Sequence, residues 1–222
     1  THLAGDVPWA VLSAGVNHQE NSSSSLSSTP VVTDIRAGRS IALEAENGSI
    51  TSEGAQIVAG YDKFGLPTIS DDPLAGDIVL SAEKGNITLN AATGTSDTSS
   101  KNSSYSVGVG VKWECGTKSK CVPGVSVSGS YGKGNDGTSG LTNYNTRVNG
   151  TGDVTILTND LTLRGATVTG NSVTAAVRNL TVESLVDTAT AEARQLNLSG
   201  SIGSDGFNAS GSTQKATGDV AI

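Results

Sequence analysis

The amino-acid sequence predicts an all-β fold, a right-handed parallel β-helix in which short strands stack coil upon coil. Three observations support this prediction. Apolar residues occur in apolar-polar-apolar triplets and not at the spacing of an amphipathic helix, and the triplets recur at a fixed offset. Bulky apolar residues are also scarce. Only 35% of the 222 residues are hydrophobic and 4% are aromatic, with two Phe and no Met. A compact globular core is therefore not expected, whereas the narrow interior of a solenoid needs few large side chains.

The predicted strands are short and are flanked by Gly, Asn or Asp, residues that favour turns. Their Val, Ile and Leu residues suit a pleated, half-buried surface, which argues against a flexible Ser- and Gly-rich stalk, the alternative that the composition allows. The clearest triplets begin at Ile41, Ile78, Ile87, Val154, Leu161, Val173 and Leu180.

The spacing of these triplets predicts the length of the coil. Val154 and Val173 are 19 residues apart, and so are Leu161 and Leu180. Such spacing is too short for a βαβ crossover and too regular for a sandwich. A coil of about 19 to 21 residues, with each strand about 4.8 Å from the strand of the coil below, satisfies it. We therefore expect residues 1–222 to form a single segment of such a β-helix.

Residues 102–149 break this rhythm and predict an antiparallel β-hairpin outside the coils. Every second position of two stretches alternates with small or polar residues, which is typical of paired strands: Val107, Val109, Val111 and Trp113, and then Val125, Val127, Gly129 and Tyr131. If the two cysteines at the tip face each other, Val111 pairs with Val125 and one face of the hairpin is apolar. We expect that face to pack along the β-helix, with the lysines of the hairpin toward solvent.

The ends of the chain are less regular. Residues 1–34 show no clear pattern, and the run at 21–28 is nearly all Ser, so we expect a loop or a disordered segment there. The chain begins in mid-pattern and ends at 219–222 inside what reads as another strand, which predicts a piece of a longer protein. No apolar run approaches the roughly 18–20 residues of a membrane-spanning helix.

The formal net charge of −7 argues against a nucleic-acid partner, because nucleic-acid-binding proteins need a basic face to displace counterions. The charge is unevenly distributed. Residues 101–133 carry five Lys and one Glu, so the hairpin differs from the rest of the chain.

Several stretches resemble a known family. The repeat LTLRGATVTGNSV at 161–173, followed by RNLTVESL at 178–185, resembles the haemagglutinin repeats of filamentous haemagglutinin and of contact-dependent inhibition exoproteins. So does AGRSIAL at 37–43. The stretch SVGVGV at 106–111 is similar to an insertion that recurs between such repeats, and the resemblance covers roughly residues 35–200.

This resemblance implies a fibrous virulence protein that is secreted to the bacterial cell surface through an outer-membrane two-partner-secretion transporter. In such adhesins and contact-dependent growth inhibition proteins, this chain would be a shaft segment that projects a distal module. The partner of that module would be a receptor, or a glycan, on a host cell or a target bacterium.

Cys115 and Cys121 are the only cysteines, and in an exported chain we expect them to form a disulfide at the hairpin tip. A zinc site is the alternative, but two thiols need partners and His2 and His18 lie far away in the sequence. We therefore predict no metal site and no cofactor.

A basic, aromatic-flanked protrusion suits anionic ligands, so Trp113, Lys118 and Lys120 are candidate contacts for an acidic polysaccharide. The other interpretation is that lysines on an exposed hairpin prevent aggregation through strand edges.

We predict no catalytic residues and no enzymatic activity. The only dense acidic cluster, Asp71, Asp72 and Asp77, reads as a solvated loop. A β-helical polysaccharide lyase or hydrolase is the enzyme alternative. Its site would need acids and bases converging on one face, where this chain offers mostly Ser, Thr and Asn.

Overall fold

The structure is a computed structural model that contains strands but no helix among the residues it describes, which are 11–62, 64–68, 74–114, 122–204 and 206–222. In this part of the chain there is accordingly no helix that could cross a membrane. The chain divides into two compact units, which we call the coil unit and the sheet unit. The coil unit comprises residues 27–96, 140–189 and 220–222, and the sheet unit comprises 1–26, 97–139 and 190–219.

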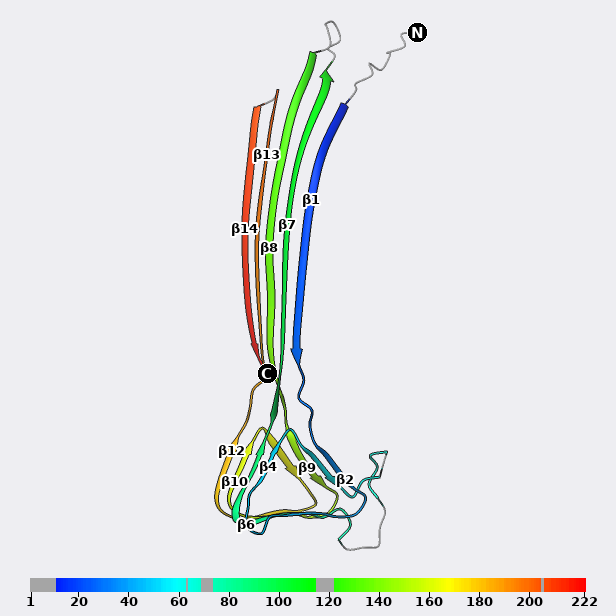
Figure 1. Ribbon diagram of the computed structural model, residues 1–222, viewed down its shortest axis with the longest axis vertical. Coiled ribbons are helices and arrows are strands. Elements are labelled where there is room, and N and C mark those ends of the chain that lie inside the picture. The colour runs from blue at the N-terminus through cyan, green and yellow to red at the C-terminus, as the bar shows by residue number, and fades with distance from the viewer. Residues whose placement is uncertain (1–10, 63, 69–73, 115–121, 205) are drawn as a thin grey trace, which may run out of the picture. The chain divides into compact units, whose positions relative to one another are not determined.

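The coil unit contains two parallel sheets. One has the strand order β12-β10-β6-β3, with β4 also paired to β6, and the other has the order β11-β9-β5-β2. Each strand pairs with the strand of the neighbouring pass, and Figure 1 shows the chain following a three-sided path again and again. The strands are β2 Asp34–Ala37, β3 Ile41–Glu44, β4 Ile50–Glu53, β5 Gln56–Ala59, β6 Ile78–Asn90, β9 Thr146–Gly150, β10 Val154–Arg164, β11 Ala166–Thr169 and β12 Val173–Glu183.

The register between β10 and β12 confirms the predicted offset. Val154 pairs with Val173 and Leu161 with Leu180, and the side chains of Arg164 and Glu183, which are 19 positions apart, form an ion pair at 2.9 Å. Parallel in-register pairing brings inward-facing residues to the same position in each pass, such as Val154 and Val173. Successive passes therefore form one continuous ladder of backbone hydrogen bonds.

The interior of the coil unit is filled by one stack of aliphatic side chains. Leu80 is fully buried, and its pairing partners Leu43 and Ile156 occupy the same inward position one pass before and after. Burying such a side chain contributes about 1.5–3 kcal/mol. The side chains that are less than 2% exposed include Ile57, Ile78, Leu80, Ile87, Leu89, Val148, Val154 and Ile156. Because every pass adds only a few of these residues, a chain poor in large side chains still acquires a dry core.

One corner of the coil unit, which we call the excursion corner, lies where β4, β6, β10 and β12 end. Two of its connections are tight and use glycine with positive φ, +66° at Gly54 and +58° at Gly165. A Cβ on Gly165 would lie 2.9 Å from the Cβ of Ala91 in the neighbouring pass, so only glycine fits without a shift. Backbone bonds join the passes here, from Ala91 N to Arg164 O at 2.7 Å and from Gly165 N to Glu183 O at 2.8 Å.

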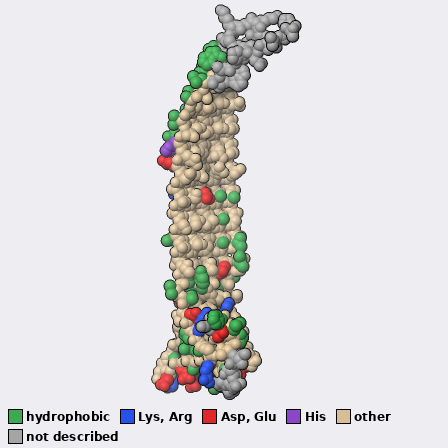
Figure 2. All heavy atoms as spheres, turned by 90° about the vertical axis from the view of Figure 1, so that its right-hand side faces the viewer, with side chains coloured by type: hydrophobic (Ala, Val, Ile, Leu, Met, Phe, Trp, Pro, Cys, Tyr) green, Lys and Arg blue, Asp and Glu red, His purple; other side chains and the backbone are tan. Residues whose placement is uncertain are grey.

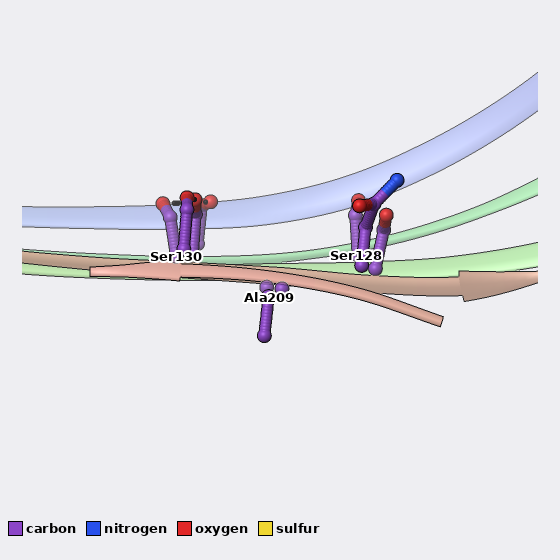
Figure 3. A pocket seen from close by; sticks show the side chains of 10 residues that line it. Ser128, Ser130 and Ala209 are labelled. Atoms are coloured by element: carbon purple, nitrogen blue, oxygen red, sulfur yellow. Dashed lines mark hydrogen bonds between the residues drawn. The ribbon is translucent and has the colours of Figure 1, made fainter. Parts of the chain in front are cut away.

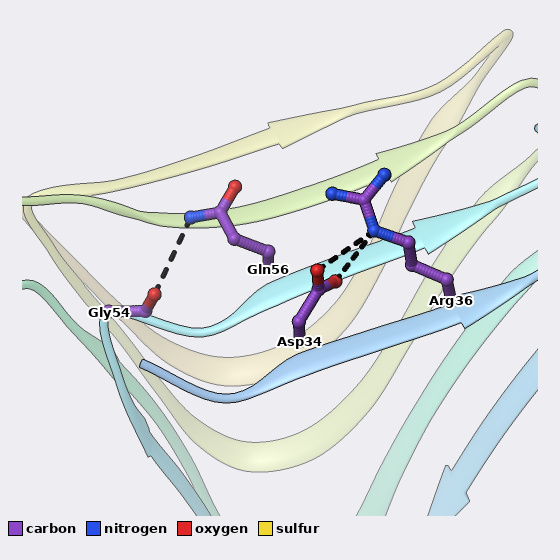
Figure 4. Close-up of polar contacts among 4 residues, drawn as sticks. All are labelled: Asp34, Arg36, Gly54 and Gln56. Carbon is purple, nitrogen blue, oxygen red and sulfur yellow. Dashed lines mark hydrogen bonds and ion pairs between the residues drawn. The ribbon is translucent and has the colours of Figure 1, made fainter. Parts of the chain in front are cut away.

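Polar side chains form short-range contacts near this corner, two of which Figure 4 shows, from Gln56 to Gly54 and from Arg36 to Asp34. The Gln56 amide nitrogen donates to the carbonyl oxygens of Gly54, at 3.4 Å, and of Asn145, at 3.1 Å. On the adjacent β2, Arg36 forms an exposed ion pair with Asp34 at 2.9 Å. The Gln56 contact spans two passes, whereas the Arg36 pair stays within its own strand.

Thr146 carries the most buried polar side chain of this corner. Its hydroxyl donates to the Asn90 carbonyl at 2.5 Å and accepts from the Ala55 N–H at 3.1 Å, while the residue is fully buried. Both partners are backbone groups at the corner, which would otherwise be left without these bonds. The Asn90 carbonyl also accepts from the Gly54 N–H at 2.9 Å, so the hydroxyl adds a second bond there and supplies the partner of the Ala55 N–H.

Replacing Thr146 by Val should lower the free energy of unfolding by about 1–3 kcal/mol, because the isosteric methyl leaves the buried Ala55 N–H unsatisfied and removes one of the two bonds to the Asn90 carbonyl. The midpoint of urea unfolding, followed by circular dichroism, measures this change. The matched control is Thr155→Val on β10, where the Thr side chain is only partly buried and the change should stay within about 0.5 kcal/mol. Equal midpoints for the two variants would contradict the role of Thr146.

The sheet unit is built on a five-stranded sheet with the order β1-β7-β8-β13-β14. Neighbouring strands of this sheet run in opposite directions, as the arrowheads of β1 and β7 show in Figure 1. The strands are β1 Val11–Ser28, β7 Ala92–Glu114, β8 Val122–Tyr144, β13 Thr188–Gly203 and β14 Gly206–Ala221.

The expectation of a loop or disordered segment at 21–28 is wrong, because these residues belong to β1. The physical reason is that a Ser-rich strand needs no apolar pattern when its backbone pairs with a neighbour. The hydroxyls of Ser24 and Ser99 hydrogen bond across β1 and β7 at 2.8 Å.

The predicted hairpin is present as β7 and β8, which are neighbours in the sheet. Hydrogen bonds between the hydroxyls of Thr98 and Thr138, at 2.6 Å, and of Ser106 and Ser130, at 2.8 Å, define its register. Counting along the strands from Ser106 and Ser130 places Val111 opposite Val125, as predicted. The sequence analysis did not predict that β1 and a second hairpin, β13–β14, would flank it. The packing of the first hairpin along the coils stays a prediction.

Candidate interaction surface

The sheet has two chemically different faces, because side chains alternate along each strand. Figure 3 shows the alternation directly: the side chains of Ser128 and Ser130 project from one side of the sheet and that of Ala209 from the other. The hydroxyl pairs between neighbouring strands show which positions share a side. We call the two sides the polar face and the apolar face.

The polar face is a flat array of small hydroxyl, amide and glycine residues. Ser106 pairs with Ser130, and Ser199 hydrogen bonds with Ser210 at 2.7 Å on the next hairpin. In Figure 2, hydrophobic and charged side chains are sparse over a broad stretch of the sheet. A shallow depression on this face is lined by Ser106, Ser128, Ser130, Ser199, Ser201, Asn208 and Ser210. Four of its hydroxyls already bond in pairs, Ser106 with Ser130 and Ser199 with Ser210.

The apolar face carries large side chains that remain accessible to water. Val107 on β7 is 55% exposed and Phe207 on β14 is 73% exposed. Its members come from all five strands: Leu12, Val16, Tyr105, Val107, Val109, Val125, Val127, Tyr131, Leu198, Ile202 and Phe207. Contiguous apolar surface of this kind marks interaction sites on proteins. The sequence analysis found only the part on the first hairpin, although Leu196 and Leu198, with Ile202, show the same alternation.

Charged and aromatic pairs interrupt the apolar face. The rings of His18 and Tyr105 stack with centroids 5.1 Å apart, and His18 also lies 3.1 Å from the Glu20 carboxylate. On β13, Glu192 accepts hydrogen bonds from the Arg194 guanidinium, and Lys215 Nζ of β14 lies 4.0 Å away. The hydrogen bond and the charge of Arg194 lower the pKa of Glu192, and Lys215 adds a smaller effect in the same direction.

Replacing Arg194 by Gln should raise the pKa of Glu192 toward its usual value, because the hydrogen bond from Arg194 is the largest cause of the shift. A carboxyl whose folded-state pKa is depressed stabilises the fold above its unfolded-state pKa, and this stabilisation is lost as the pH falls through the folded-state pKa. A pH titration of the Glu192 side chain by NMR measures the shift. Lys215→Gln is the control and should move the pKa less; a larger effect from Lys215 would contradict this assignment.

Of the predicted contact residues, Trp113 lies near the end of β7 and is 38% exposed. Cys115, Lys118, Lys120 and Cys121 lie outside the described residues. The disulfide and the contact with an anionic ligand therefore stay predictions.

A metal site is not assembled within the described ranges. No group of three or more His, Cys, Asp or Glu side chains there could hold a metal ion. Asp77 accepts a hydrogen bond from the backbone N–H of Asp153 at 2.8 Å, so its carboxylate links two passes of the coil unit. Asp71 and Asp72 lie outside the described residues.

The family assignment rests on comparison with known proteins. The family model described as "Hemagglutinin repeat" matches residues 14–198 of this chain. The chain belongs to the hemagglutinin-repeat family. It is similar to Toxin CdiA of Escherichia coli, with 34% identity over 189 residues, which cover 83% of this chain but 6% of that protein. This chain therefore spans only a small part of the relative's length, and no solved structure matches it significantly.

Proposed function

We propose that this chain is a shaft segment of a large secreted exoprotein, in which stacked coils hold a distal module away from the cell surface. The coils would form a right-handed parallel β-helix. The observation that carries the proposal is the in-register pairing of Val154 with Val173, which lets further coils be added without changing the cross-section. The membership in the hemagglutinin-repeat family supports it.

The similarity to Toxin CdiA supports a place in an adhesin or toxin-delivery protein of the two-partner-secretion type. The partners would be an outer-membrane transporter and a receptor on a target cell, and the location would be the bacterial surface. The proposed role is not enzymatic. Stability in such a shaft comes from backbone ladders and aliphatic stacking, and neither requires a reactive side chain.

A deletion that removes whole coils, so that the two joined residues occupy equivalent positions in the coil, should leave delivery of the distal module by the parent exoprotein intact. Asp34 and Arg147 are both register partners of Gln56, so removing residues 34–146 joins Thr33 to Arg147 at an equivalent position. We expect secretion and target-cell delivery within twofold of the parent level, with the shaft shorter by about 9.6 Å for two coils.

The matched control is the deletion of 34–150, which removes four more residues and with them β9. The next pass then lacks its strand in the second sheet, and we expect loss of the secreted protein, measured by immunoblot of culture supernatants. If the deletion of 34–146 leaves the protein secreted but abolishes delivery, that result would count against a passive shaft.

The alternative function is direct contact with a receptor or glycan through the hairpin tip, which the exposure of Trp113 favours. If the segment is a passive shaft, changing both Lys118 and Lys120 to Ala should leave cell binding by the parent protein unchanged within twofold. Binding of labelled protein to target cells measures this. A loss of tenfold or more, with Lys101→Ala and Lys133→Ala as the charge-matched control, would favour the alternative.

A further inference from the structure

The connections at the excursion corner alternate between tight turns and long hairpins. β4 connects to β5 through Gly54, and β10 connects to β11 through Gly165. Between these tight turns, β6 connects to β9 through the hairpin β7–β8, and the chain leaves β12 through β13 and β14. β1 precedes β2 in the same way that β8 precedes β9. The chain therefore makes one long excursion for every two coils.

Strands of successive excursions pair with each other in a fixed pattern. We call β1, β8 and β14 the returning strands, because each runs back toward the excursion corner. The outer edge of β1 pairs with β7, the outgoing strand of the next excursion, and Ser24 bonds to Ser99 across that seam. The outer edge of β8 likewise pairs with β13, where Ser139 bonds to Thr190 at 2.6 Å. Each returning strand that is followed by another excursion thus pairs with the outgoing strand of that next excursion.

The pattern can repeat because the rise of two coils equals the width of one two-stranded hairpin. Two coils advance by about 9.6 Å, and the two strands of one hairpin also occupy about 9.6 Å, since both spacings are the distance between hydrogen-bonded strands. If one hairpin follows every two coils, each new hairpin therefore starts one hairpin width beyond the previous one. A hairpin at every coil would be crowded, and one at every third coil would leave a gap in the sheet.

The outer edge of β14 shows a regular row of backbone groups. Ile222 and Asp187 exchange both backbone hydrogen bonds, 2.9 Å each, so the even-numbered residues of β14 direct their N–H and C=O groups toward β13. The hydroxyl bond between Ser199 and Ser210 shows the same pairing twelve residues earlier in the strand. The odd-numbered residues, such as Thr213, therefore direct their backbone groups to the outer edge. No strand of the described residues pairs there.

We propose that the outer edge of β14 binds the outgoing strand of a further hairpin of the same design, carried by the next pair of coils in the longer exoprotein. This rests on the proposed shaft function, in which coils continue. The occupant is an extended strand of about the length of β14, with small polar residues on one face and apolar residues on the other. It continues both faces of the sheet and covers an edge that would otherwise favour aggregation.

The chain itself provides a test, because a second copy of residues 143–222 placed directly after Ile222 supplies two coils and one hairpin. In residues 1–222 alone, amide hydrogen exchange at Thr213, Lys215 and Thr217 should be fast. In the tandem protein it should be at least tenfold slower, because the copied β13 bonds to these N–H groups. Fast exchange there in a tandem protein whose added coils are folded would overturn the proposal.

Two proline variants separate edge pairing from general stability. Thr213→Pro removes an N–H that points outward and should leave residues 1–222 folded, but it should abolish the added protection in the tandem protein. Gln214→Pro removes an N–H that bonds to β13 and should destabilise both proteins. Equal effects of the two variants on residues 1–222 would overturn the assigned edge.

The outcomes also distinguish other occupants and the failure of the shaft proposal. Slow exchange at Thr213 in residues 1–222 that depends on protein concentration would show that a second copy occupies the edge, and it would overturn the proposal. Protection in the tandem protein supports edge pairing whatever the deletion of 34–146 does to delivery. Loss of delivery with that deletion would reject the shaft role and not the pairing.

Discussion

Parallel backbone pairing between successive passes of the chain is the interaction on which the rest of the structure depends. It sets the offset between Val154 and Val173, and it stacks like residues on like residues. A globular core must enclose its apolar residues on all sides, whereas here each pass is covered by its neighbours above and below. A chain with 35% hydrophobic residues therefore has enough of them. The same pairing explains why the exposed surface tolerates so many small polar residues.

The second consequence concerns the strands that leave the coils. Because coils and sheet strands share one spacing, hairpins that leave every second coil can pair into one continuous sheet. The sheet does not form a second core. It presents Val107 and Phe207 to water on one face and a lattice of paired hydroxyls such as Ser106 and Ser130 on the other. Such a surface can extend with the coils, which distinguishes it from a site built once in a domain.

The sequence predicted the features that follow from strong local periodicity. The offset of 19 residues and the opposition of Val111 and Val125 could be read because apolar residues alternate at those positions. The strand at 21–28 could not be predicted, because Ser residues carry no apolar signal and its pairing with β7 is set by residues far away in the chain. Thr146 was missed for a similar reason, since its role depends on an interrupted ladder that only the fold shows.

The most direct test of the central claim is the set of nuclear Overhauser contacts between backbone protons of residues in neighbouring passes, in an isotopically labelled chain. Parallel in-register stacking predicts contacts between Val154 and Val173 and between Leu161 and Leu180, each separated by the same 19 positions along the whole of β10. Antiparallel pairing would instead give contacts whose separation changes by two residues for each step along the strand. Observing that second pattern between β10 and β12 would contradict the account.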